Sequence, residues 1–154
     1  MASGSLADIE ALAGESTQTV EIGGVAVPGF ADSHVHVSGV GRLLEWLNVR
    51  AMTNAQIVEL VAEAVNSTPS GQWIFGRGWD EGFFRPSVFP TTADLDAVSP
   101  DNPVMLTRID GHASWVNSQV LELSGITAGN VDPDGGRVVR GTGNEPTGML
   151  VDNA

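Results

Sequence analysis

Residues 53–76, TNAQIVELVAEAVNSTPSGQWIFG, decide the predicted fold class because they place a helix directly before a strand. Thr53 and Gln56 have the spacing of a helix capping box, and apolar residues then follow one helical stripe until the turn formers at 68–71 end it. Trp73 to Gly76 forms a short apolar run that is typical of a strand. The stretch therefore predicts one helix-to-strand step of an α/β fold.

The same alternation extends to both sides of this stretch. Upstream, Phe30 to Val37 predicts a strand. Downstream, the pattern predicts a brief helix opened by the capping residues Thr91 and Asp94, a strand over Val104–Ile109 and a helix over Ser114–Ser124. This order favours parallel strands joined by right-handed crossovers, as in half-barrel or doubly wound folds.

Both ends of the chain depart from this alternation. Near the N-terminus, a capping pattern predicts a short helix over residues 6–13, and Thr17–Ile22 with Val25–Val27 predicts a hairpin around a Gly-Gly turn. Near the C-terminus, two strand-like runs within about 136–151 enclose a loop rich in turn formers. These runs predict a hairpin insertion.

The composition restricts the chemistry that the chain can perform. The 154 residues include 19 acidic and 7 basic side chains, for a formal charge of −12, which disfavours binding to nucleic acid or to an anionic membrane. No apolar run predicts a membrane span or a signal peptide, so a cytoplasmic setting is expected by default. The sequence has no cysteine and no lysine, so histidine and carboxylate are the only strong candidate metal ligands.

The histidine pair at positions 34 and 36 is the clearest chemical motif. Residues two apart in a strand project from the same face, so a strand over Phe30–Val37 would place His34 and His36 where both imidazoles can bind one ion. Asp32 would share that face, and could bind the metal or orient an imidazole. The alternative is two histidines that lie at a strand end by chance.

Two further residues follow predicted strands, where loops of α/β folds meet substrates. His112 precedes a predicted helix, so it is a candidate for contact with substrate or for packing at the helix start. Trp79 could form an aromatic pocket wall or belong to the core. The residues alone leave both alternatives open.

Residues 28–36, PGFADSHVH, resemble the Pro-Gly-Phe-x-Asp-x-His-x-His signature of the amidohydrolase superfamily. The resemblance runs from about Gly4 to the C-terminus, and its ordered blocks are similar to those of amidohydrolase family 3, which includes N-substituted formamide deformylases. The blocks are Gly76–Asp80, Pro90–Asp96, Asp101–Val104, Arg108–Ala113, Asn117–Ser118 and Pro146–Gly148.

The resemblance implies a (β/α)8 TIM barrel that carries a small β-sandwich. On this basis residues 1–29 are expected to be a β-sandwich remnant with a lead-in hairpin. Residues 30–154 are expected to hold the first three strand–helix units of the barrel, followed by the hairpin insertion. The chain would then be an N-terminal fragment whose open sheet edge allows a homo-oligomer.

The resemblance also implies hydrolysis of a non-peptide carbon–nitrogen bond in a small amide-type substrate by metal-activated water. His34 and His36 would bind a divalent metal, with zinc as the first choice, and Asp32 would orient an imidazole. His112 and Trp79 would contact substrate. Family members take their other ligands, a lysine, two histidines and an aspartate that is also the general base, from later strands, so no catalytic residue is assigned here and the chain is expected to be inactive alone.

Two other functions remain open at this point. The chain could be a non-catalytic remnant of the fold that binds metal or forms oligomers. It could also belong to an enzyme that performs a related reaction on the same scaffold, such as ring opening of a cyclic amide or deamination.

Overall fold

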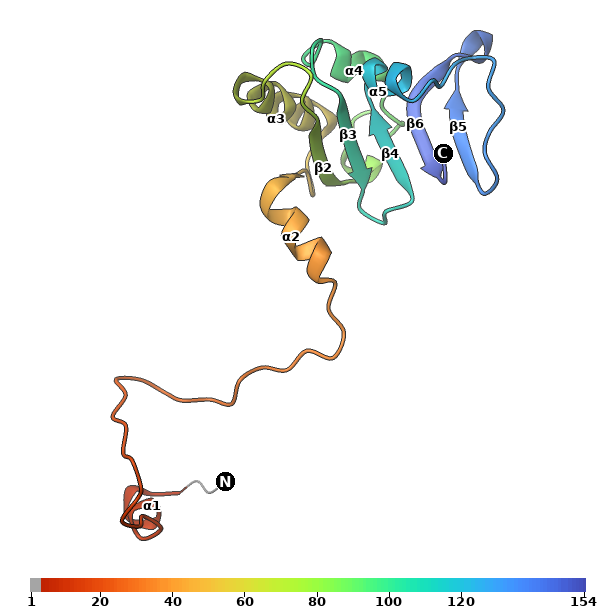
Figure 1. The fold of residues 1–154 in the computed structure, drawn as a ribbon. Coiled ribbons are helices and arrows are strands. Elements are labelled where there is room, and N and C mark those ends of the chain that lie inside the picture. The colour runs from red at the N-terminus through yellow and green to blue at the C-terminus, as the bar shows by residue number, and fades with distance from the viewer. Residues whose placement is uncertain (1–3) are drawn as a thin grey trace. The chain divides into compact units, whose positions relative to one another are not determined.

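The computed structural model describes residues 4–154 and divides the chain into two compact units. One unit ends at Val35, and the other extends from His36 to Ala154 (Figure 1). Among the described residues, no helix combines the length and the apolar character that crossing a membrane requires.

From Gly4 onward, the N-terminal unit contains one short helix, α1 (Leu6–Glu10). The helix begins with a capping box, in which the hydroxyl of Ser5 accepts the backbone N–H of Asp8 and the Asp8 carboxylate accepts the backbone N–H of Ser5. These bonds satisfy two donors that an uncapped helix would leave without partners. The helix predicted over residues 6–13 is therefore confirmed in its first part.

The hairpin predicted at residues 17–27 and the strand predicted over Phe30–Val37 are both wrong in this structure. None of the described residues of the N-terminal unit lies in a strand, and all of them are exposed. Val37 instead begins helix α2 (Val37–Glu45). A strand is stable only when its backbone groups pair with a neighbouring strand and one of its faces is covered, and the described part of this unit supplies neither.

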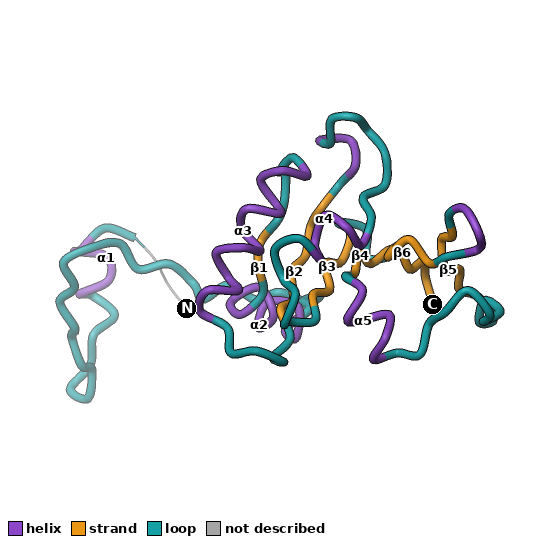
Figure 2. Tube along the Cα trace, turned by 90° about the horizontal axis from the view of Figure 1, so that it is seen from above, coloured by secondary structure: helices purple, strands orange, loops and turns teal. Residues whose placement is uncertain are grey.

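The second unit is built on a six-stranded sheet with the strand order β1-β2-β3-β4-β6-β5, which can be followed from strand to strand in Figure 2. The first three strands pair in parallel, and the remaining pairings are antiparallel. The strands are β1 (Leu47–Asn48), β2 (Ile74–Trp79), β3 (Val104–Arg108), β4 (Ala113–Val116), β5 (Gly136–Arg140) and β6 (Pro146–Asp152).

Helices α3 (Asn54–Ser67) and α4 (Thr92–Asp96) connect the parallel strands. The predicted capping box of α3 is present, because Thr53 Oγ1 accepts the backbone N–H of Gln56 and the Gln56 side chain accepts that of Thr53. This alternation confirms the α/β class. The closed TIM barrel stays a prediction, since only β1, β2 and β3 are parallel. The remaining short helices are η1 (Glu81–Phe83), α5 (Ser118–Leu123) and η2 (Thr142–Asn144).

The hairpin predicted at about 136–151 is confirmed by β5 and β6, which pair antiparallel. The helix predicted over Ser114–Ser124 is wrong in its first part, because Ala113–Val116 forms β4 between β3 and β6. Pairing on both edges buries Trp115 and Val116, and this tertiary gain overrides the local helical pattern.

The two faces of the sheet carry separate apolar clusters. Trp115 lies in the larger cluster and its neighbour Val116 in the smaller one, as expected when successive side chains of a strand point to opposite faces. Ile57 and Val61 of α3 pack in the larger cluster. The smaller cluster is completed by Val120, Leu121, Val138 and Leu150.

The buried side-chain amide of Asn117 stabilises the connection between β4 and α5 through hydrogen bonds. Asn117 is 0% exposed, and its Oδ1 accepts the backbone N–H groups of Val104 (3.1 Å) and Val120 (3.3 Å). Its Nδ2 donates to the backbone carbonyl of Asn102 (2.8 Å) and to the hydroxyl of Ser99 (3.2 Å). One side chain thus caps α5 and ties it to the start of β3, and its polar atoms are satisfied inside the core.

Candidate functional site

The predicted metal ligands lie where the chain passes from one unit to the next. His34 belongs to the N-terminal unit, and Asp32 Oδ1 accepts its backbone N–H at 2.9 Å. His36 is the first residue of the second unit and occupies the N-cap position of α2. Because no strand forms here, Asp32, His34 and His36 do not share a strand face, which corrects the geometry assumed from the sequence.

The residues present do not by themselves fit a complete metal centre. Within residues 4–154, no group of three or more histidine, cysteine, aspartate or glutamate side chains is placed to hold one metal ion. A catalytic zinc usually requires three protein ligands in addition to water. Metal binding by His34 and His36, and the choice of zinc, therefore stay predictions.

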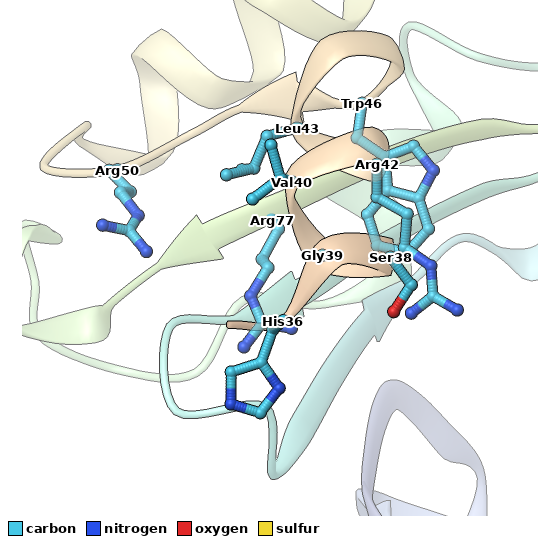
Figure 3. Close-up of a pocket in the computed structure, with 9 residues that line it drawn as sticks. All are labelled: His36, Ser38, Gly39, Val40, Arg42, Leu43, Trp46, Arg50 and Arg77. Atoms are coloured by element: carbon cyan, nitrogen blue, oxygen red, sulfur yellow. The ribbon is translucent and has the colours of Figure 1, made fainter. Parts of the chain in front are cut away.

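A pocket of about 440 Å³ opens in the second unit beside α2 (Figure 3). Three of the chain's seven basic residues, Arg42, Arg50 and Arg77, line this pocket, and no acidic residue does. The other lining residues are His36, Ser38, Gly39, Val40, Leu43 and Trp46. The pocket is therefore strongly basic within a protein of net charge −12.

Two of these arginines come from neighbouring parallel strands. Arg77 lies within β2, and Arg50 follows β1, whose Asn48 pairs with Arg77. The carboxyl ends of parallel strands are the usual position of active sites in α/β folds. The sheet thus places Arg50 two residues beyond the carboxyl end of β1 and Arg77 two residues before the carboxyl end of β2.

An ionic cluster occupies the end of the next strand, β3. Both edges of the Arg108 guanidinium are used: Nε and Nη2 donate to the carboxylate of Glu81 at 2.9 and 2.5 Å, and Nη1 donates to Asp110 at 2.5 Å. Hydrogen bonding with Glu81 raises the pKa of Arg108. The pKa of Asp110 is lowered, first because its carboxylate accepts the backbone N–H of His112 and also because Arg108 is nearby.

His112 lies in the exposed turn between β3 and β4. Its Nδ1 is 2.8 Å from Asp152 Oδ1, and its side chain is 74% exposed. An imidazole held by a carboxylate keeps its second nitrogen available for a ligand. This geometry is compatible with contact to substrate, which stays a prediction.

Trp79 lies in the core. Its side chain is 0% exposed, and its indole N–H donates to the carbonyl of Leu106 at 2.7 Å. The ring stacks on Phe84 with centroids 6.1 Å apart, and Arg108 lies over it at 5.9 Å. The structure thus favours the packing alternative for Trp79, and a role in substrate binding stays a prediction.

Sequence reasoning gave no role to Arg50 or Arg77. The available signal was partial, because Arg77 directly follows the predicted strand Trp73–Gly76, whereas no strand was predicted directly before Arg50. Arg77 is also part of the Gly76–Asp80 block. The missing information was the pairing of β1 with β2, which places Asn48 opposite Arg77.

Comparison with known proteins agrees with the fold and the family signature. A model of the amidohydrolase family matches residues 22–154. YtcJ of Bacillus subtilis strain 168 is 41% identical over 143 residues, covering 90% of this chain and 27% of YtcJ. The N-substituted formamide deformylase of Arthrobacter pascens is 30% identical over 155 residues, covering 98% of this chain and 29% of the deformylase.

A solved structure is similar as well. A metal-dependent hydrolase from Pyrococcus furiosus superposes with a TM-score of 0.55 and 28% identity, covering 82% of this chain and 23% of that structure. The chain thus spans less than a third of the length of each of these three proteins. The family model nevertheless covers most of the chain and includes both histidines of the signature. The chain belongs to the amidohydrolase family.

Proposed function

We propose that this chain contributes the metal-binding start of a metal-dependent hydrolase that cleaves a non-peptide carbon–nitrogen bond in a small amide-type molecule. The observation that carries the proposal is the family match over residues 22–154. Two relatives support the chemistry: one is named for deformylation of N-substituted formamides, and one is described as a metal-dependent hydrolase.

In this proposal, His34 and His36 bind a divalent metal, with zinc as the first candidate. Imidazole is a preferred zinc ligand, and the chain has no thiolate to compete with it. The backbone of His34 is held by Asp32, which restricts the loop that carries the ligand. The metal would supply an activated water for hydrolysis.

The proposal also includes a negative expectation for the isolated 154-residue chain. The sequence has no lysine, and residues 4–154 gather no group of three metal-binding side chains. Two imidazoles leave a catalytic zinc short of protein ligands. We therefore expect no turnover of N-formyl or N-acyl amides by this chain with added zinc, and measurable turnover by a preparation free of other hydrolases would contradict this expectation.

Metal content tests the ligand assignment directly. The chain is dialysed against zinc, and bound metal is measured by plasma mass spectrometry for the unchanged sequence and for the His34→Ala/His36→Ala double variant. Loss of the bound zinc in the double variant is expected, while His112→Ala should retain it because His112 is outside the signature. Equal zinc content in the double variant and the unchanged chain would contradict the assignment.

The edges of the sheet favour a second candidate function, oligomerisation without turnover. Strands β1 and β5 each have one neighbour in the described sheet, and unpaired strand edges can recruit another chain. Light scattering tests this candidate. A dimer or larger species that persists on dilution supports it, and a monomer at all concentrations excludes it.

A further inference from the structure

The basic pocket beside α2 carries charge that the protein does not neutralise. Within residues 4–154, none of Arg42, Arg50 and Arg77 forms an ion pair, although the chain has 19 acidic residues. By contrast, Arg108 is paired with Glu81 and Asp110. The acidic side chains thus compensate the arginine at the end of β3 and leave those of the pocket available to a ligand.

Two glycines leave room for the side chains of Arg50 and Arg77. A Cβ atom at Gly78 would lie 2.4 Å from Cγ of Arg50, so a residue larger than glycine would displace Arg50 from this position. Gly78 also has a φ of +113°, a backbone conformation that residues with a Cβ atom rarely adopt. Arg77 Nη2 would lie 3.4 Å from a Cβ at Gly111, and it is 3.5 Å from the carbonyl oxygen of Ile109. The arginines Arg50 and Arg77 therefore pack against glycines, and the carboxylate nearest to Gly111 in the sequence, that of Asp110, pairs with Arg108.

The pocket combines this charge with apolar surface. Figure 3 shows Arg77 extending toward the end of α2 where His36 lies, and Arg42 beside Trp46. The guanidinium carbon of Arg42 is 5.4 Å from the Trp46 ring centroid. Val40 and Leu43, both about half exposed, add aliphatic surface to the lining. A ligand that matches the pocket needs an acidic group for the arginines and an apolar body for these side chains.

We propose that this pocket binds an organic anion, with Arg50 and Arg77 pairing with its carboxylate or phosphate and with Leu43 and Trp46 contacting its apolar part. His36, a metal ligand in the proposed function, lines the same pocket. The substrate of the proposed hydrolysis is then an amide that carries an acidic group. This assignment of substrate class rests on the proposed function, whereas anion binding can be measured without metal or turnover.

Titration calorimetry in metal-free buffer tests the proposal with three probes. N-Acetylphenylalanine carries a carboxylate, phenyl phosphate carries a phosphate, and N-acetylphenylalanine amide is the uncharged analogue. We expect one or both acids to bind, and the stronger of the two identifies the acidic group. The amide should bind at least about tenfold more weakly, and affinity for the acids should fall as salt screens the arginines. Equal binding of acid and amide would overturn the proposal.

Variants locate the site. Arg77→Ala and Arg50→Ala should each weaken binding of the preferred acid about tenfold or more. Arg77→Lys should weaken it less, because lysine keeps the positive charge but lacks the planar guanidinium that can donate two parallel hydrogen bonds. Arg137→Ala is the matched control, because it removes an exposed arginine that is absent from the pocket lining and should leave affinity unchanged. Circular dichroism melting checks that each variant is folded. An equal loss of affinity in Arg137→Ala would show that net charge, and not the pocket, attracts the anion.

The two proposals fail in different ways. If the acids bind through Arg50 and Arg77 while the double histidine variant retains its zinc, the anion site stands and the metal assignment falls. If zinc depends on His34 and His36 but no acid binds, the substrate class falls and the hydrolase proposal stands.

Discussion

Helix α1 in the N-terminal unit and helix α3 in the second unit begin with the same device, a hydroxyl paired with a side chain three residues later. Both helices form where the sequence predicts them, although α1 buries none of its residues and α3 buries Ile57 and Val61. Strands behave differently in the two units: the second holds a six-stranded sheet, and the described part of the first holds no strand. A capping box is completed within four residues, whereas a strand needs a partner from elsewhere in the chain.

Removal of the Trp115 side chain from the second unit should produce the largest change in the free energy of unfolding. Trp115 is 0% exposed, and its indole N–H donates to the carbonyl of Thr91 at 2.8 Å. Trp115→Ala should lower the free energy of unfolding by about 3–5 kcal/mol, because it opens a cavity in the core and removes the hydrogen bond to Thr91. Urea unfolding measures the change, and Val20→Ala, at a side chain that is 78% exposed, should alter it by less than about 0.5 kcal/mol. Similar losses for the two variants would refute the contrast between the units.

The buried amide of Asn117 gives the next largest effect. Asn117→Ala should cost about 2–3 kcal/mol of unfolding free energy, because it removes the cap of α5 and leaves the backbone N–H of Val104 without its side-chain acceptor. Asn66→Ala, at an exposed position of α3, is the control and should change stability by less than about 0.5 kcal/mol. A loss in Asn117→Ala no larger than in the control would mean that the network is not energetically coupled to the fold.

Substitutions in the two capping boxes compare the contributions of α1 and α3 to stability directly. Thr53→Ala should lower the free energy of unfolding of the sheet by about 1 kcal/mol, because α3 packs against the core. Ser5→Ala removes the equivalent hydroxyl from α1, which buries no residue, so the same unfolding transition should not move. The measurement is the urea midpoint recorded by tryptophan fluorescence. A shift of equal size for Ser5→Ala would show that α1 contributes to the core after all.

The smallest change in stability is expected at the ionic cluster that Arg108 forms with Glu81 and Asp110 at the end of β3. Because the folded-state pKa of Asp110 lies below its ordinary value of 3.8, the ionised carboxylate stabilises the fold above about pH 4, and this contribution is lost as the pH falls through the folded pKa. Asp110→Asn should therefore cost less than about 1 kcal/mol at pH 7, since the group is more than a third exposed. The difference between the variant and the unchanged chain should shrink toward pH 3. A difference that grows with acidity would contradict the sign of the shift.

Local signals in the sequence account for much of the fold and for the family. The caps at Ser5 and Thr53 predicted where α1 and α3 begin, and the turn formers between β5 and β6 predicted their hairpin. The signature around His34 and His36 predicted the family that the match over residues 22–154 confirms. The composition shows that these 154 residues supply neither a thiolate nor a lysine amine. Each of these inferences depends on side-chain chemistry and on spacings of a few residues.

Other features depended on contacts between distant residues. Ser114–Val116 lies in a predicted helix, but pairing with β3 and β6 makes it part of strand β4. Phe30–Val37 has a strand pattern and no partner strand among the described residues. The basic pocket beside α2 depends in the same way on the register that pairs Asn48 with Arg77, because this pairing brings Arg50 and Arg77, 27 positions apart in the sequence, into the lining of one pocket. The sequence by itself determined the residue types, the caps and the family. Only the tertiary structure decided which extended segments became strands and which charges came together, because the stabilisation of a strand or of a charged pocket comes from residues far away along the chain.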